Sequence, residues 1–180
     1  MLKVVNANTK SFMNISIVKP IISFRAQPKN YAIIDENISR SGQPAPEDFV
    51  WLKQQGVTDV INFRMPSLSP DGFDEKSQVA RLGMKYHNIP TLPDKPSEAG
   101  IKTFLNLMDE IINKGGKAHI HCRAGADRTG MYAFVYKSIK NIGNPVENEV
   151  EWLMHGHNYK KFPDLITWTK KTLKQLNKII

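Results

Sequence analysis

One loop of this 180-residue chain reads His121-Cys122-Arg123-Ala124-Gly125-Ala126-Asp127-Arg128-Thr129-Gly130. The preceding residues, 117–120, follow two glycines and predict a short buried strand, whereas residues 129–140 have the length and composition of a helix. The loop between them is expected at a helix N-terminus, where unpaired N–H groups and the helix dipole favour an anion. Gly125 and Gly130 let the backbone curl without side-chain clashes. The sequence therefore predicts a phosphate-binding loop.

Two side chains of this loop have the chemistry that cleavage of a phosphate ester requires. Helix N-termini and nearby cations favour the thiolate form of a cysteine, so Cys122 is expected to be a nucleophile. Arg128, six positions later, can bind two phosphoryl oxygens with its planar guanidinium, which a lysine cannot match. The remaining phosphate contacts are expected from the backbone N–H groups of Arg123, Ala124, Gly125, Ala126, Asp127 and Arg128.

The order His-Cys, five residues, Arg-Thr-Gly resembles the loop of the cysteine-dependent phosphatases, the dual-specificity and tyrosine phosphatase superfamily. Two further motifs, residues 40–44 (Arg-Ser-Gly-Gln-Pro) and 60–64 (Val-Ile-Asn-Phe-Arg), look like the opening motifs of its small bacterial and fungal-type members. The resemblance implies a metal-independent phosphomonoesterase that needs no cofactor and forms a cysteinyl phosphate. It also implies that the Thr129 hydroxyl stabilises the departing thiolate, although the same residue type could simply cap the helix.

The resemblance also implies a general acid, for which the sequence offers alternatives. The family places an aspartate about 30 residues before its cysteine, and Asp94, in a proline-rich segment that predicts a loop, precedes Cys122 by 28 residues. Asp127 lies inside the loop itself, where some bacterial and lipid-active members use an aspartate as acid or base. We expect Asp94 to be the acid and keep Asp127 as the alternative. Asp71 and Asp74 are more distant and are expected to be turn residues.

Histidines and arginines near these motifs have both catalytic and structural interpretations. His121 ends the predicted buried strand, so its side chain is expected to point away from the loop. We expect a structural role in which it influences the ionisation of the Cys122 thiol without touching substrate. The other histidines lack the spacing of a zinc site, and no metal is expected. Arg40 and Arg64 are expected near the mouth of the cleft, because loops at the carboxyl ends of parallel strands meet at ligand sites. Surface salt bridges would explain these two arginines equally well.

The pattern of elements predicts one α/β domain, with a short, mostly parallel central sheet flanked by helices, like that of dual-specificity phosphatases. Strands are expected at 31–34, 38–41, 57–63, 84–89 and 117–120, the first two as a hairpin and 84–89 as a central strand. Helices are expected at 46–55, 75–82, 98–114, 129–140, 145–155 and 163–177. The phosphatase domain is thus expected to occupy residues 31–180, preceded by a basic arm, residues 1–30, to which the sequence gives no role.

The charge and the cysteine content of the chain indicate which partners and which cellular compartment to expect. The net charge is +8, and both ends of the chain are basic, which favours polyanionic substrates or weak contact with an anionic membrane; an ordinary solvated surface explains the charge as well. A single cysteine excludes an internal disulfide, and a working thiolate favours a reducing compartment. We expect a cytoplasmic monomer without nucleic-acid partners. The basic N-terminus leaves a secreted or organelle-targeted form open.

Three functions compete. The first is a protein tyrosine or dual-specificity phosphatase, acting on phosphorylated proteins. The second is a phosphoinositide or inositol phosphate phosphatase: Arg123 and the basic ends support it, whereas Ala126 stands where several such enzymes have lysine. The third is a non-catalytic phosphate-binding adaptor, which the joint presence of Cys122, Arg128, Thr129 and a candidate acid disfavours. A sulfur-transfer enzyme would also use a cysteine loop but would have no need of Arg128.

Overall fold

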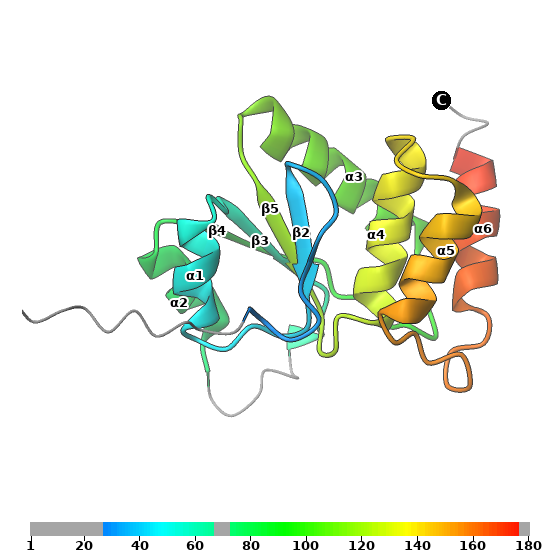
Figure 1. The fold of residues 1–180 in the computed structure, drawn as a ribbon, viewed down its shortest axis with the longest axis horizontal. Helices are drawn as coiled ribbons and strands as arrows, with labels where there is room; N and C mark the ends of the chain where they lie inside the picture. Colours follow the sequence, from blue (N-terminus) through cyan, green and yellow to red (C-terminus); the bar gives the residue numbers. More distant parts are fainter. Residues whose placement is uncertain (1–26, 67–72, 177–180) are drawn as a thin grey trace, which may run out of the picture.

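A five-stranded sheet lies between two layers of helices in the computed structural model, which describes residues 27–66 and 73–176 (Figure 1). The strands are β1 (Ala32–Ile33), β2 (Ile38–Ser41), β3 (Asp59–Asn62), β4 (Lys85–Asn88) and β5 (Ala118–His121). Their order is β1-β2-β5-β3-β4, and only the β1-β2 hairpin is antiparallel. The predicted hairpin and the mostly parallel sheet are both confirmed.

One strand lies elsewhere in the sheet than expected. The strand expected at 84–89 as a central one is β4, which pairs only with β3 and forms an edge. Its side chains are exposed or only partly buried, and β4 is the last strand at this side of the sheet among the described residues. The apolar residues that suggested a central position, Met84 and Ile89, flank the strand and are buried at its two ends.

β5 occupies the centre of the sheet and carries two different faces. Its partners are β2 and β3, so that Ile120 lies beside both Arg40 and Ile61. Because side chains alternate along a strand, Ala118 and Ile120 face one helical layer and the two histidines face the other. The loop that carries Cys122 therefore leaves the middle of the sheet at its carboxyl edge, where loops of parallel strands meet.

The helices are α1 (Asp48–Gln54), α2 (Glu75–Arg81), α3 (Glu98–Asn113), α4 (Asp127–Ile139), α5 (Pro145–Met154) and α6 (Leu165–Leu176). A small apolar cluster joins α1 and α2 to the sheet, and a larger one joins α3, α4, α5 and α6 to its other face. Sequence signals set several ends: Ser97 caps α3, and Asn144 with Glu147 forms a capping box before α5. Among the described residues, no helix has the length and apolar character needed to cross a bilayer.

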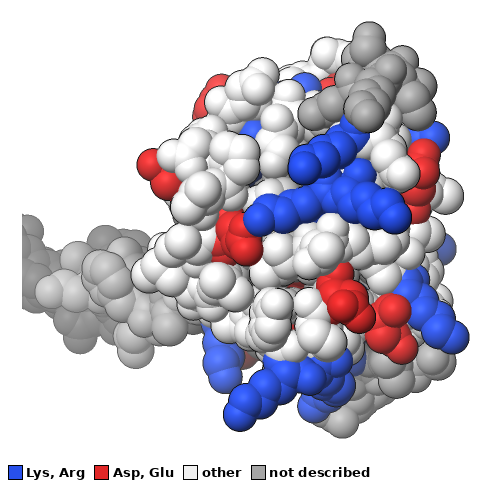
Figure 2. Space-filling model, turned by 90° about the vertical axis from the view of Figure 1, so that its right-hand side faces the viewer, with Lys and Arg blue, Asp and Glu red and all other residues white. Residues whose placement is uncertain are grey.

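Charges on the face formed by α5 and α6 are mixed. Figure 2 views this side of the molecule and shows basic side chains in separate groups with acidic side chains between them. Lys170 of α6 pairs with Glu149 of α5, and Lys137 of α4 pairs with Glu151 of α5. The first pair joins α6 to α5 and the second joins α4 to α5, and in each pair the carboxylate offsets a positive charge.

α4 packs against α5 through a glycine. A Cβ atom at Gly130 would lie 2.0 Å from Cδ1 of Trp152, whose indole is 1% exposed. Such a distance is far below van der Waals contact, so any larger residue at position 130 would displace the indole. The last glycine of the Arg-Thr-Gly sequence therefore has a packing role that is independent of phosphate binding.

We predict that Gly130→Ala lowers the free energy of unfolding by about 1–3 kcal/mol, although alanine normally stabilises a helix relative to glycine by about 1 kcal/mol. The loss should be smaller in a Trp152→Leu background, where the clash is relieved. Urea denaturation of the two single variants and the double variant measures both effects. A stabilised Gly130→Ala variant would contradict the packing role.

Candidate active site

The loop between β5 and α4 is closed tightly against the end of β2. Cys122 follows β5 and is 2% exposed, and α4 begins at Asp127, two residues before the start expected from the sequence. Gly125 adopts a φ of 72°, and a Cβ there would lie 2.5 Å from the backbone nitrogen of Gly42. Only glycine allows both this backbone conformation and this close approach.

Three consecutive carbonyl oxygens of the loop accept hydrogen bonds from groups outside it. The Arg123 carbonyl accepts from the Gln43 N–H at 3.1 Å. The Ala124 carbonyl accepts from Asn30 Nδ2 at 3.0 Å, and the Gly125 carbonyl accepts from Arg40 Nη2 at 2.7 Å. In the described part of the chain, no backbone N–H of residues 123–128 donates to another protein group. With its carbonyls bound on the outer side, the loop presents N–H groups at a helix N-terminus, the arrangement that binds anions.

Arg128 connects the loop to the segment that carries one candidate acid. Its Nη1 donates to the carbonyl oxygen of Phe63 at 3.2 Å, and the N–H of Thr91 donates to the same oxygen at 3.3 Å. The segment containing Asp94 thus begins beside the Arg128 guanidinium. Asp94 itself is exposed in a turn and lines a hollow of about 140 Å³ with Phe162, Asp164 and Trp168 among its walls.

Asp127, the other candidate acid, is bound to the segment after α5. Its Oδ1 accepts hydrogen bonds from His157 Nδ1 and from the Asn158 N–H, both at 2.8 Å. The His157 side chain is fully buried, and its ring packs beside Trp152. Asp127 therefore fastens this segment to the start of α4. No local pattern predicted this contact, because His157 lies 30 residues later in the chain and belongs to no motif.

Thr129 is buried in the first turn of α4 and does not cap it, since the capping position is Ala126. The helix-capping interpretation of this residue was wrong because α4 starts earlier than expected. Its hydroxyl makes no hydrogen bond within residues 27–66 and 73–176. Asp74, expected to be a turn residue, caps α2 by accepting from the Ser77 N–H, whereas Asp71 lies outside the described residues.

The two arginines expected at the mouth of the cleft have different positions. Arg40 is 1% exposed and lies beneath the loop, so the expectation was wrong for this residue. Arg64 donates from Nη1 to Gln43 Oε1 at 2.8 Å. Burial lowers the pKa of Arg64, and the nearby charge of Arg128 lowers it further.

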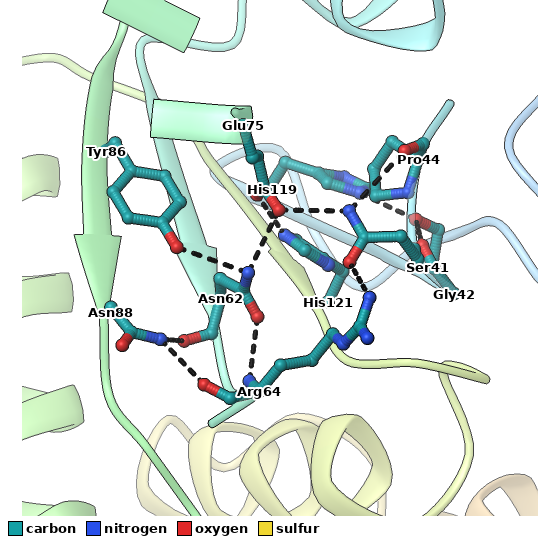
Figure 3. A network of polar contacts seen from close by, with 11 residues as sticks. Ser41, Gly42, Pro44, Asn62, Arg64, Glu75, Tyr86, Asn88, His119 and His121 are labelled. Carbon is teal, nitrogen blue, oxygen red and sulfur yellow. Dashed lines mark hydrogen bonds and ion pairs between the residues drawn. The ribbon is translucent and has the colours of Figure 1, made fainter. Parts of the chain in front are cut away.

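His121 faces away from α4 toward a buried carboxylate (Figure 3). Its Nε2 lies 2.7 Å from Oε1 of Glu75, which is 5% exposed. The other carboxylate oxygen of Glu75 accepts from Asn62 and from the Gln43 side chain. Burial acts to raise the pKa of Glu75, but the charge and hydrogen bond of His121, the hydrogen bond from Gln43 and the charge of Arg64 outweigh burial and lower it. Sequence reasoning missed Glu75, which is 46 residues from His121 and outside both motifs.

His119 lies behind this network as a neutral ring. Its Nε2 is 2.8 Å from the Ser41 hydroxyl and its Nδ1 is 2.9 Å from the Ser39 hydroxyl. Because Ser41 gives its proton to the Gly42 carbonyl at 2.6 Å, Nε2 must donate and Nδ1 must accept. Complete burial, together with the charge of His121, holds the pKa of His119 well below its usual range.

Metal ligands are not grouped in the described part of the chain: no set of three or more His, Cys, Asp and Glu side chains there is arranged to hold an ion. The groups that can compensate phosphate charge around Cys122 are instead the loop N–H groups and the arginines. The arrangement combines a cysteine, an anion-binding loop and a guanidinium on adjacent elements. Together they can bind a phosphoryl group and bring a nucleophile to it.

Comparisons with known proteins agree with this geometry. Residues 36–138 match the protein family described as "Polymorphic toxin system, DSP-PTPase phosphatase". A beta-lactamase hydrolase-like protein of Xylella fastidiosa is 29% identical over 141 residues, covering 77% of this chain and 31% of that protein. The inositol diphosphatase DSP3 of Arabidopsis thaliana is 26% identical over 121 residues, covering 64% of this chain and 57% of that protein. The chain therefore spans only part of the length of these relatives.

A solved structure shows the same fold. The crystal structure of a DUF442 protein from Shewanella putrefaciens CN-32 superposes with a TM-score of 0.66 and 28% sequence identity. The match covers 81% of this chain and 94% of that one. The sheet, the helices and the loop between β5 and α4 thus belong to an architecture that is already known.

We predict that the buried, neutral His119 makes folding pH-dependent. Below about pH 6.5 the unfolded chain binds a proton at this histidine and the folded chain does not, so stability falls as pH falls. The contribution is at most about 1.4 kcal/mol per pH unit. Urea denaturation at about pH 7.5 and about pH 5.5 should show a smaller difference for His119→Gln than for the native chain. Equal differences would contradict the assignment.

Proposed function

The chain belongs to this DSP-PTPase phosphatase family, and on that premise we propose that it hydrolyses phosphomonoesters without a metal ion, through a cysteinyl phosphate on Cys122. The observation that carries the proposal is the outward anchoring of carbonyls 123, 124 and 125, which leaves the loop N–H groups for phosphate oxygens. Arg128 adds a planar pair of donors beside them. These groups supply the charge stabilisation that a metal ion provides in other phosphoryl-transfer enzymes.

In the first step, the Cys122 thiolate attacks phosphorus while the bond to the leaving oxygen breaks, and a general acid gives that oxygen a proton. We assign this proton to Asp94, because its segment begins beside Arg128. Asp127 is the alternative. Its Oδ1 accepts hydrogen bonds from His157 and from the Asn158 N–H, which hold this carboxylate against the segment after α5.

In the second step, water attacks phosphorus, the S–P bond breaks, and the thiolate leaves with the bonding electron pair. Water loses a proton to the carboxylate that acted as acid in the first step, so the two steps together consume one water and release phosphate. We propose that the buried Thr129 hydroxyl stabilises the departing thiolate, since it lies one residue after Arg128 in the first turn of α4.

We propose phosphotyrosine, with phosphoserine and phosphothreonine as further substrates, in line with the description of the family. Inositol phosphates are the second candidate. Two observations favour them: the proximity of Arg64 to Arg128, which suits a substrate with more than one phosphate, and the relative named as an inositol diphosphatase. The first candidate needs only the single phosphate site of the loop.

Hydrolysis rates of a phosphotyrosine peptide, a phosphothreonine peptide and an inositol polyphosphate, measured with a metal chelator present, test the proposal. We predict turnover of the tyrosine peptide, less than about 1% of that rate for Cys122→Ser, and a similar loss for Arg128→Lys. Arg81→Lys, an exposed arginine of α2, is the matched control and should retain full activity. Hydrolysis of the inositol substrate alone would identify inositol phosphates as the substrate. Loss of activity in the presence of the chelator would contradict the metal-independent mechanism.

The two candidate acids differ in their response to the leaving group. We predict that Asp94→Asn reduces turnover of an aryl phosphate with a poor leaving group by about a hundredfold or more, yet spares one whose leaving group departs unaided. Asp127→Asn should mainly change phosphate affinity. Asp164→Asn, which alters a carboxylate of the same hollow as Asp94, is the matched control. If Asp127→Asn alone shows the leaving-group dependence, the assignment of the acid is reversed.

A further inference from the structure

Arg40 is a fully buried cation close to the reactive cysteine. It lies on β2 beside Ile120 of β5, two residues before Cys122. The alternation of side chains along β2 directs it to the face that α4 and α5 cover, whereas Ser39 and Ser41 face His119. With 1% of its surface exposed, the guanidinium has exchanged water for protein contacts almost completely.

The contacts of Arg40 do not balance its charge. Nη2 donates to the Gly125 carbonyl at 2.7 Å, Nη1 lies 3.6 Å from Oε1 of Glu151, and Nε has no partner in the described part of the chain. Glu151 also pairs, through its other oxygen, with Lys137. One carboxylate is therefore shared by two cations. A buried charge needs a counter-charge, and an anionic sulfur at Cys122 would complete the balance.

Electrostatic coupling between these groups supports the same conclusion. Burial lowers the pKa of Arg40 to about 10, while the charges of Glu151 and of Cys122 both act to raise it.

We propose that Arg40 is a positioning residue with two effects: its hydrogen bond to Gly125 holds the loop in shape, and its buried charge keeps Cys122 in the thiolate form. The inference rests on the proposed function only in taking Cys122 as the nucleophile. In this proposal Arg40 and Arg128 have different roles, because Arg40 lies under the loop and does not contact substrate. A lysine could supply the charge, but its single ammonium cannot reproduce the fork that reaches Gly125 and Glu151 together.

Charged and titratable groups surround the Cys122–Arg40 pair from every neighbouring element. They are Arg64 after β3, His121 on the opposite face of β5, Arg123 of the loop, Asp127, Arg128 and Lys137 of α4, and Glu151 and His155 at the end of α5. Because several of these are cations, the effect of Arg40 must be isolated by variants that change one charge at a time. Glu151 provides the opposite change at the same place.

The pH dependence of Cys122 alkylation by iodoacetamide tests the proposal on the full chain and needs no substrate. We expect the midpoint of the alkylation profile to rise by about one pH unit in Arg40→Gln, because the thiolate loses its buried counter-charge. Glu151→Gln should lower the midpoint, since Arg40 then acts on the sulfur with less compensation. Arg40→Lys should keep a midpoint near that of the native chain while reducing phosphatase turnover at least tenfold.

Asn30→Ala is the matched control. It removes the uncharged anchor of the neighbouring carbonyl, that of Ala124, and should reduce turnover without moving the alkylation midpoint. An unchanged midpoint in Arg40→Gln, or shifts of the same sign in Arg40→Gln and Glu151→Gln, would overturn the proposal. If Arg40→Gln does not fold, the downward shift in Glu151→Gln is the deciding result. Opposite shifts in a chain without phosphatase activity would refute the proposed function and leave this inference intact.

Discussion

The site depends on the hydrogen bonds that hold the loop carbonyls away from its centre. A backbone turn that exposes several N–H groups on one side leaves its carbonyl oxygens on the other, and buried carbonyls without donors are costly. Here a backbone N–H, an amide side chain and a guanidinium satisfy three carbonyls in a row. All three donors come from residues 30–43, so the region around the N-terminal hairpin determines the shape of a loop 80 to 94 residues later.

Buried charge is placed on both sides of the sheet beneath this loop. On the face of α1 and α2, Glu75 bonds His121 and is in turn held by Gln43 and Asn62. On the face of α4 and α5, Arg40 lies between the loop and Glu151. Gln43 also accepts a hydrogen bond from Arg64, so one side chain joins the Glu75 network to the guanidinium groups near the loop. Substitutions in either network should therefore affect the loop without touching substrate.

Local signals in the sequence predicted most elements of this fold and the identity of the loop. The short run after two glycines that predicted β5 and the patterns that predicted α3 and α5 are local, which is why these elements were found. The errors concern contacts between distant segments. Arg40 was expected at the cleft mouth because the order of the strands, which places β2 beside β5, is not encoded locally. For the same reason Glu75 and His157 carried no signal.

The central claim is that phosphate is transferred to Cys122 and then to water. The most direct measurement is mass spectrometry of the peptide containing Cys122 after rapid acid quenching of the enzyme during turnover of a phosphotyrosine peptide. The account predicts a single phosphoryl group on that peptide, attached to sulfur and lost on longer incubation. Turnover without a phosphorylated Cys122 peptide at any quench time, or phosphate attached to a histidine instead, would contradict it.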